Sequence, residues 1–121
     1  MTKTQNSKQY DLEERTFKFA KRVIEFCKKL PRTVENIELI KQVVWASGSI
    51  GANYIEANEA LSKKDFRMRI KICRKEAKES RYWLRLIVET NKLIEDEEGK
   101  FLIQESTEFI KIFNSILTKS K

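Results

Sequence analysis

Residues 62–94 read "SKKDFRMRIKICRKEAKESRYWLRLIVETNKLI". Ser62 followed by Asp65 is typical of a helix start, because the side chain of each residue can accept a hydrogen bond from the backbone N–H of the other. Beyond this signal, mostly apolar or small side chains recur in steps of four and three. These are Phe66, Ile70, Cys73, Ala77, Ser80, Leu84, Ile87, Asn91 and Ile94. Such steps place side chains on one face of an α-helix. The stretch therefore predicts one long amphipathic helix.

Three more helices are predicted around this one. Residues 11–30 carry the same spacing, and Pro31 ends that helix because proline disfavours helical geometry in the residue before it. A second helix is expected over 34–61, and a fourth follows the polar turn at 95–100. The predicted inward residues of the first and fourth helices are Leu12, Thr16, Phe19, Val23, Phe26 and Leu30, and then Leu102, Ser106, Phe109, Phe113 and Ile116.

Long helices with short connections favour an all-α fold, an up-down-up-down four-helix bundle. We expect a mobile polar tail at residues 1–9 and a single bundle domain at 10–121. Two helical hairpins that pair between chains are the alternative. We find no signal-peptide pattern and no apolar run near the roughly 18 residues that span a membrane, so we expect a cytoplasmic protein without membrane contact.

The second helix has two candidate buried stripes. One runs through Ile37, Ile40 or Lys41, Val44, Ser47 or Gly48, Gly51, Ile55 and Asn58, and the other through Val43, Ile50, Tyr54, Ala57 and Leu61. Burial of both implies neighbours on more than one side. Trp45 falls on neither stripe, and a tryptophan outside the core pattern is typical of an interface.

Inside this helix, residues 46–61 read "ASGSIGANYIEANEAL". Each glycine in a helix costs about 1 kcal/mol relative to alanine. Small residues four apart share a face, and they let another helix backbone approach closely. We therefore interpret the stretch as a packing site followed by a polar clasp, although a kink is the alternative. The residues concerned are Ser47, Gly48, Gly51, Ala52, Asn53 and Glu56, joined from the third helix by Glu76 and Glu79.

Positive charge is concentrated in the third helix. The chain has a formal net charge of +7, and residues 63–85 hold ten Lys or Arg against three acids, which is the same +7. Six of these cations repeat at four-three spacing and form what we call the basic ribbon. They are Arg67, Lys71, Arg74, Lys78, Arg81 and Arg85.

Like charges on one helix face repel each other, and nucleic-acid phosphates would relieve that repulsion. Tyr82, at the edge of the ribbon, could stack on a base. Two alternatives remain: acids of a neighbouring helix or subunit, such as those at 95–98, neutralise the ribbon, or the ribbon is a solvated face.

Catalytic and metal sites have little support. The chain contains no histidine, and its two cysteines, Cys27 and Cys73, lie on apolar faces where they act as small hydrophobes. Glu56, Glu76 and Glu79 could pair for acid–base work or bind a hard metal ion. The alternative is a set of buried ion pairs and hydrogen bonds that fix helix register or subunit contacts. We expect no enzymatic activity, no metal and no cofactor.

The segments "SIGANYIEANEALSKKDF" and "IKICRKEAKESRYWLRLI" resemble the signature of the four-helix bundle proteins named after the 23S ribosomal RNA intervening sequence. The resemblance extends from about Phe17 to Leu117. Residues that match the family pattern are Glu56, Asp65, Phe66, Glu76, Glu79 and Leu84. Glu-Ala-Asn-Glu at 56–59 departs from the Ala-Glu-Gly of many members.

The resemblance implies a cytosolic bacterial protein without known enzymatic activity that assembles as a ring of five. Some members are encoded inside ribosomal RNA genes, and a related bundle assists the reverse transcriptase of diversity-generating retroelements. We therefore expect a homo-oligomer, as a pentamer by resemblance, that binds nucleic acid, RNA above all, through the basic ribbon. The alternative is a structural or scaffold ring whose ribbon mediates subunit or protein-partner contacts.

Overall fold

Four α-helices account for nearly all of the chain. A computed structural model describes the backbone of residues 2–121 and the side chains of residues 12–121. The helices are α1 (Thr2–Lys28), α2 (Val34–Asn58), α3 (Lys63–Thr90) and α4 (Glu97–Lys119), and residues 2–121 contain no strand. The all-α class is therefore as predicted. The tail expected at residues 1–9 falls outside the part of the chain that is described in full.

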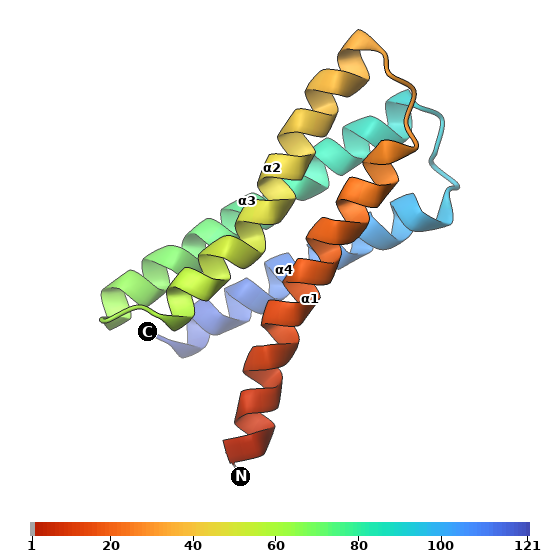
Figure 1. Cartoon of the computed structure of the whole chain (residues 1–121). Helices are drawn as coiled ribbons and strands as arrows, with labels where there is room; N and C mark the ends of the chain where they lie inside the picture. The colour runs from red at the N-terminus through yellow and green to blue at the C-terminus, as the bar shows by residue number, and fades with distance from the viewer. Residues whose placement is uncertain (1) are drawn as a thin grey trace.

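The helices pack as two pairs, one in front of the other (Figure 1). α1 and α2 lie side by side, α3 lies behind α2, and α4 lies behind α1. Near the start of α2, Asn36 donates a hydrogen bond to Asn91, which lies just beyond the end of α3. Near the end of α2, Asn53 accepts a hydrogen bond from Arg69, which lies near the start of α3. These contacts show that α2 and α3 run antiparallel.

The core lies where the four helices meet. All six inward residues predicted for the first helix are buried, and so are Leu102, Ser106, Phe109 and Phe113 of α4. The Phe19 and Phe109 rings meet edge to face with centroids 5.3 Å apart, which joins α1 to α4 at the centre. The four-three pattern thus identified most of the core of these two helices correctly, but at the end of α4 the buried residue is Leu117, and the predicted Ile116 is only partly buried.

α2 buries most of one predicted stripe and only part of the other. Val43, Ile50, Tyr54 and Ala57 are buried, and so is Ser47 of the other stripe, while Ile37 and Ile55 at the ends of that stripe are exposed. The expectation that both stripes are fully covered is wrong among the described residues, because α2 packs mainly against α1 and α3 and reaches α4 through Tyr54, whose ring centroid lies 6.3 Å from that of Phe113. Trp45 also points outward, with 73% of its surface exposed.

Side chains cap the helix starts. Ser62 Oγ accepts a hydrogen bond of 3.1 Å from the backbone N–H of Asp65, as predicted. Thr33 caps α2 and Asp96 caps α4 in the same way. Caps of this kind satisfy backbone donors that have no partner inside the helix.

Three helices end before the predicted residue. α1 stops at Lys28 rather than Leu30, α2 at Asn58 rather than Leu61, and α3 at Thr90 rather than Ile94. Leu61 and Ile94 are consequently 98% and 57% exposed, although the pattern had placed both on buried stripes. After α3 the backbone turns at Lys92, whose φ of 58° lies in the left-handed region and cannot continue the helix. Among the described residues, no helix is long and apolar enough to cross a membrane.

Candidate nucleic-acid interface

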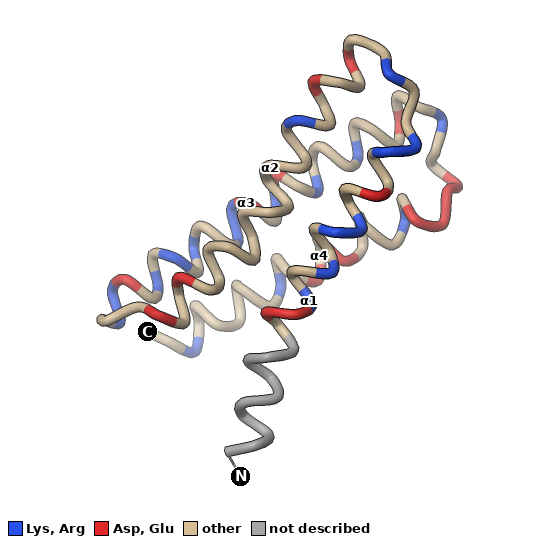
Figure 2. Tube along the Cα trace, viewed as in Figure 1, with Lys and Arg blue, Asp and Glu red and all other residues tan. Residues whose placement is uncertain are grey.

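The basic ribbon follows the edge of α3 that borders α4, and Lys and Arg recur along that helix (Figure 2). Arg67 donates from Nη1 to the backbone oxygen of Leu117 at 2.6 Å and to Ser120 Oγ at 2.8 Å. Arg74 donates to Asn114 Oδ1 at 2.9 Å. All three acceptors are neutral, so α4 holds these guanidinium groups in place without cancelling their charge.

The other end of the ribbon is more nearly neutral. Arg81 Nε donates to Thr107 Oγ1 at 3.0 Å, again a neutral acceptor on α4. Arg85 lies 3.7 Å from the carboxylate of Glu89, which is four residues later on the same helix. Both members of that pair are more than half exposed, so the ion pair contributes little energy.

The acidic run at 95–98 does not neutralise the ribbon within this chain. Glu95 pairs with Lys100 at 2.9 Å, and Glu98 pairs with Arg22 at 2.6 Å. Each partnership lowers the pKa of the glutamate, mainly through the hydrogen bond to the cation. The suggestion that these acids offset the ribbon is therefore not met inside the described part of the chain.

Tyr82 stands at the surface beside the ribbon. Its ring is 58% exposed and meets Trp83 edge to face, with centroids 5.0 Å apart. An exposed ring held by a neighbouring aromatic offers a flat face to a nucleic-acid base.

The small-residue stretch of α2 has two different surroundings. Gly51 faces α1, where an added Cβ would lie 2.9 Å from Thr16 Oγ1, so this glycine allows the two helices to approach closely. At Gly48 an added Cβ would meet nothing within 4 Å, and Ala52 is exposed. The close approach expected at Gly48 and Ala52 is thus absent within this chain. Ser47 is buried and donates to the oxygen of Val44.

A polar contact does join α2 and α3 next to this stretch. Arg69 donates to Asn53 Oδ1 at 2.9 Å, and Asn53 donates in turn to the backbone oxygen of Ser49 at 2.9 Å. Glu56 and Glu79 are both exposed, which corrects the interpretation that they are buried acids.

Glu76 is the buried acid of this region, with 8% of its surface exposed. It lies seven residues after Arg69, and hence on the face of α3 turned toward α2. Its Oε2 is 3.9 Å from Lys75 Nζ, but Oε1 has no hydrogen-bond partner among the described residues, and neither has Ser80 Oγ. Burial, aided by the negative charge of Glu79, raises the pKa of Glu76.

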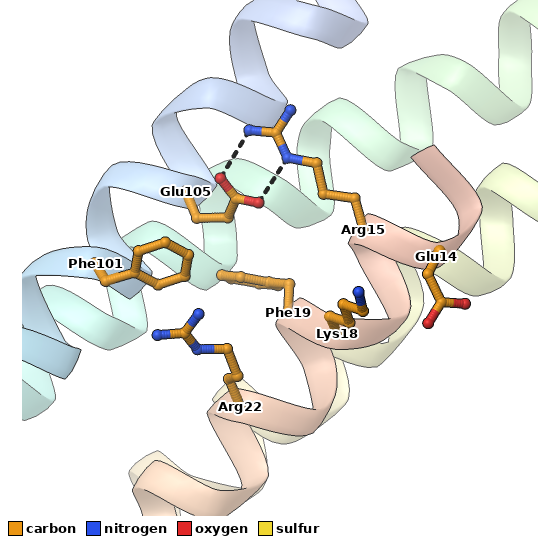
Figure 3. A pocket seen from close by; sticks show the side chains of 7 residues that line it. All are labelled: Glu14, Arg15, Lys18, Phe19, Arg22, Phe101 and Glu105. Atoms are coloured by element: carbon orange, nitrogen blue, oxygen red, sulfur yellow. Dashed lines mark hydrogen bonds and ion pairs between the residues drawn. The ribbon is translucent and has the colours of Figure 1, made fainter. Parts of the chain in front are cut away.

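Sequence reasoning missed a clamp between α1 and α4. Arg15 donates two hydrogen bonds of 2.7 and 2.8 Å to the carboxylate of Glu105, as Figure 3 shows. Arg22 likewise donates two hydrogen bonds to the carboxylate of Glu98. The Arg22 guanidinium also lies 3.7 Å from the centre of the Phe101 ring. A signal was present: the two arginines are seven residues apart, and so are the two glutamates.

This clamp borders a pocket of about 180 Å³ that Phe19 and Lys18 also line (Figure 3). Three of the charged groups that line it already have ion-pair partners, since Arg15 binds Glu105 and Arg22 binds Glu98. The arrangement therefore serves to join helices.

Nothing in the described residues supports metal or thiol chemistry. They contain no group of three or more Cys, Asp or Glu side chains that could hold a metal ion. Burial raises the pKa of the Cys27 thiol to about 11 and that of Cys73 to about 12, so both stay protonated near neutral pH. This fits the prediction that the cysteines are core residues.

Comparison with known proteins places the chain in a family. The model of the family described as 23S rRNA-intervening sequence protein matches residues 8–115. The chain belongs to this family. The resemblance inferred from the "SIGANYIEANEALSKKDF" segment is thereby confirmed.

A solved structure supports the assignment. The chain is 33% identical to a protein of unknown function from the S23 ribosomal protein family of Bacteroides thetaiotaomicron. The match has a TM-score of 0.78 and covers 87% of this chain and 96% of that one. No curated protein matches the chain. Neither family description names an enzymatic activity.

Proposed function

We propose that this member of the 23S rRNA-intervening sequence family is a non-enzymatic accessory protein of the bacterial cytoplasm that binds RNA through the basic ribbon. The observation that supports it best is the ribbon itself. Six cations lie along one edge of α3, and among the described residues only Arg85 has an acid within ion-pair distance. A family description that refers to ribosomal RNA fits the same reading.

The neutral acceptors on α4 strengthen the argument. Arg67, Arg74 and Arg81 are held by a backbone oxygen, an amide and a hydroxyl, none of which removes charge. Cations fixed in this way lose little side-chain freedom on binding, and phosphates would replace their mutual repulsion with attraction. The contacts are to phosphates, so binding should depend on salt and tolerate sequence changes.

Charge reversal tests the proposal. Arg74→Glu with Arg81→Glu should weaken binding to a single-stranded RNA at least tenfold. It should also make the slope of log K against log salt less steep by about 1.4, which is about 0.7 for each lost phosphate contact. Lys21→Glu with Lys28→Glu is the matched control, because these exposed cations on α1 have the same spacing of seven.

We further propose that the chain is an up-down-up-down bundle that assembles into a homo-oligomeric ring, as a pentamer by resemblance to its family. The supporting observation is a shallow groove of about 620 Å³ along the outer face of α2. Ile40, Val44, Trp45, Gly48 and Ala52 line it. An apolar surface of this kind on a soluble helix is typical of an interface, and the open space at Gly48 would admit a helix of a second copy.

Sedimentation analysis of Trp45→Glu tests the assembly, because Trp45 is exposed and its replacement should leave the monomer folded. Loss of the oligomer is the expected result. The same measurement on Arg74→Glu with Arg81→Glu separates the RNA-binding role from the scaffold role. If that variant keeps its RNA affinity and loses the oligomer, the ribbon is a subunit interface and the RNA-binding proposal is wrong.

A further inference from the structure

One end of the basic ribbon forms a pocket, where the start of α3 meets the end of α4. Arg67, Lys71 and Arg74 line it from α3, Asn114 and Thr118 line it from α4, and Lys121 lines it from just beyond the end of α4. Its volume is about 270 Å³. Sequence reasoning identified the first three residues as part of a linear ribbon, and the fold adds the second three to make a concave site.

The charge and chemistry of the lining define the ligand class. Four of the lining residues are cations, and none is an acid. Asn114 contributes an amide nitrogen that can donate hydrogen bonds, whereas the Thr118 hydroxyl already donates to the backbone oxygen of Asn114 at 3.0 Å. A set of cations and a neutral amide donor without acidic side chains is suited to an anion that presents several oxygen acceptors, and a phosphoryl group does so.

The two arginines are already oriented toward α4. Arg67 uses Nη1 for its bonds to Leu117 and Ser120, and Arg74 uses Nη1 for its bond to Asn114. In the described residues their other guanidinium nitrogens donate to no protein group, and Lys71 has no acidic partner. The pocket therefore combines fixed positive charge with donors that are still available.

We infer that this pocket binds a phosphoryl group of the nucleic acid, and that it is the principal phosphate site of the ribbon. The inference rests on the proposed function and deepens it. The Arg85 end of the ribbon is a weaker candidate, because Glu89 offsets its charge. The phosphoryl group is either the monoester at a strand end or a diester within the strand. A monoester carries up to two negative charges and a diester carries one.

Variants at the C-terminal end of the bundle test the pocket while leaving all six ribbon cations in place. Thr118→Val with Lys121→Gln removes a polar hydroxyl and a charge from the lining, and both residues are exposed, so the bundle should remain folded. Ser115→Ala with Lys111→Gln is the matched control: it makes equivalent changes on exposed positions of α4 outside the pocket. The probes are single-stranded RNAs of about twelve nucleotides with a 5′-phosphate or a 5′-hydroxyl.

The pocket variant should lose at least fivefold in affinity, and the control should stay within twofold of the wild type. A loss confined to the 5′-phosphorylated RNA identifies the terminal monoester as the ligand, and an equal loss on both RNAs identifies an internal diester. If the pocket variant binds both RNAs as the wild type does, while Arg74→Glu with Arg81→Glu still abolishes binding, the pocket inference is wrong and the proposed function stands.

Titration with inorganic phosphate tests the pocket independently of RNA binding. If the wild-type protein binds no RNA, the proposed function is wrong, and titration with phosphate followed by amide NMR then tests the pocket alone. Shifts at Thr118 and Asn114 that the pocket variant lacks would support an anion site. The absence of such shifts in the wild type would overturn it.

Discussion

Asn36 and Asn91 hold each other through two hydrogen bonds of 2.9 Å, in which each side-chain amide donates to the oxygen of the other. Asn36 is buried near the start of α2, with 2% of its surface exposed, and it also donates to the backbone oxygen of Pro31. Asn91 also donates to the oxygen of Ile87 at the end of α3. The pair therefore links two helix ends and the loop after α1 at one point.

Asn91→Ala should lower the free energy of unfolding by about 1–3 kcal/mol, because the Asn36 side-chain oxygen would be left buried without a donor. Urea denaturation measures the loss. The double variant with Asn36→Ala should cost less than the sum of the two single variants, since each single change already breaks the pair. Strict additivity would show that the two amides do not depend on each other.

Gly51 and Gly48 should respond to alanine in opposite directions. Gly51→Ala would place a Cβ against Thr16, and we expect a loss of about 1–3 kcal/mol in unfolding free energy. Gly48→Ala meets no neighbour, and it should gain up to about 1 kcal/mol from the better helix propensity of alanine. Thermal or urea unfolding of dilute protein measures both. A loss at Gly48 that appears only at high protein concentration would show that a second chain covers it.

The sequence predicted the core of α1, α3 and α4 better than that of α2, because burial imposes the helical period on the side chains that face inward. Ile70, Cys73, Ala77, Leu84 and Ile87 are all fully buried on the face expected of them. A period alone does not say which of two apolar stripes has a neighbour. For that reason the outward stripe of α2, which includes Ile55, could not be told from the inward one.

Contacts between helices were harder to predict than the helices themselves. Asn36 and Asn91 are 55 residues apart, and nothing local to either marks the other as its partner. The buried state of Glu76 and the exposed state of Glu79 likewise depend on where α2 crosses α3. The ribbon was visible because its spacing lies within one helix, whereas its pocket needed the end of α4.

The Arg22–Glu98 pair should make the free energy of unfolding depend on pH in the acidic range. Its hydrogen bond lowers the pKa of Glu98, so the pair stabilises the folded state above the ordinary carboxyl pKa of about 4.3 and is lost as pH falls through the lower folded value. Both side chains are more than a third exposed, so Arg22→Gln should cost less than about 1 kcal/mol at pH 7.

The cost of Arg22→Gln should shrink as the pH falls below about 4, and urea denaturation at a series of pH values measures it. Any cost that remains in acid reports the contact of Arg22 with the Phe101 ring. Phe101→Leu is the control, because it removes the ring and leaves the ion pair, so its cost should not change with pH. A pH-independent cost for Arg22→Gln would show that the ion pair adds nothing.

Glu76→Gln should stabilise the protein at neutral pH. Burial raises the pKa of Glu76, so the folded state holds the proton more tightly than the unfolded state does. Stability therefore falls as the pH rises from about 4.3 through the raised pKa that Glu76 has in the folded state. The charged carboxylate consequently destabilises the folded protein at pH 7. The amide removes that charge, and we expect a gain of up to about 1 kcal/mol that disappears below about pH 4. Glu56→Gln, at an exposed position, is the control and should change stability little at any pH.

Protein concentration makes the Glu76 measurement informative about assembly. In dilute protein the Glu76 Oε1 has no partner among the described residues, and the gain from glutamine should appear in full. If the gain becomes a loss as concentration rises, a cation of a second copy must reach Glu76, because breaking a buried ion pair is costly. A loss at every concentration would contradict the prediction, since it would mean that the carboxylate already has a favourable partner within the single chain.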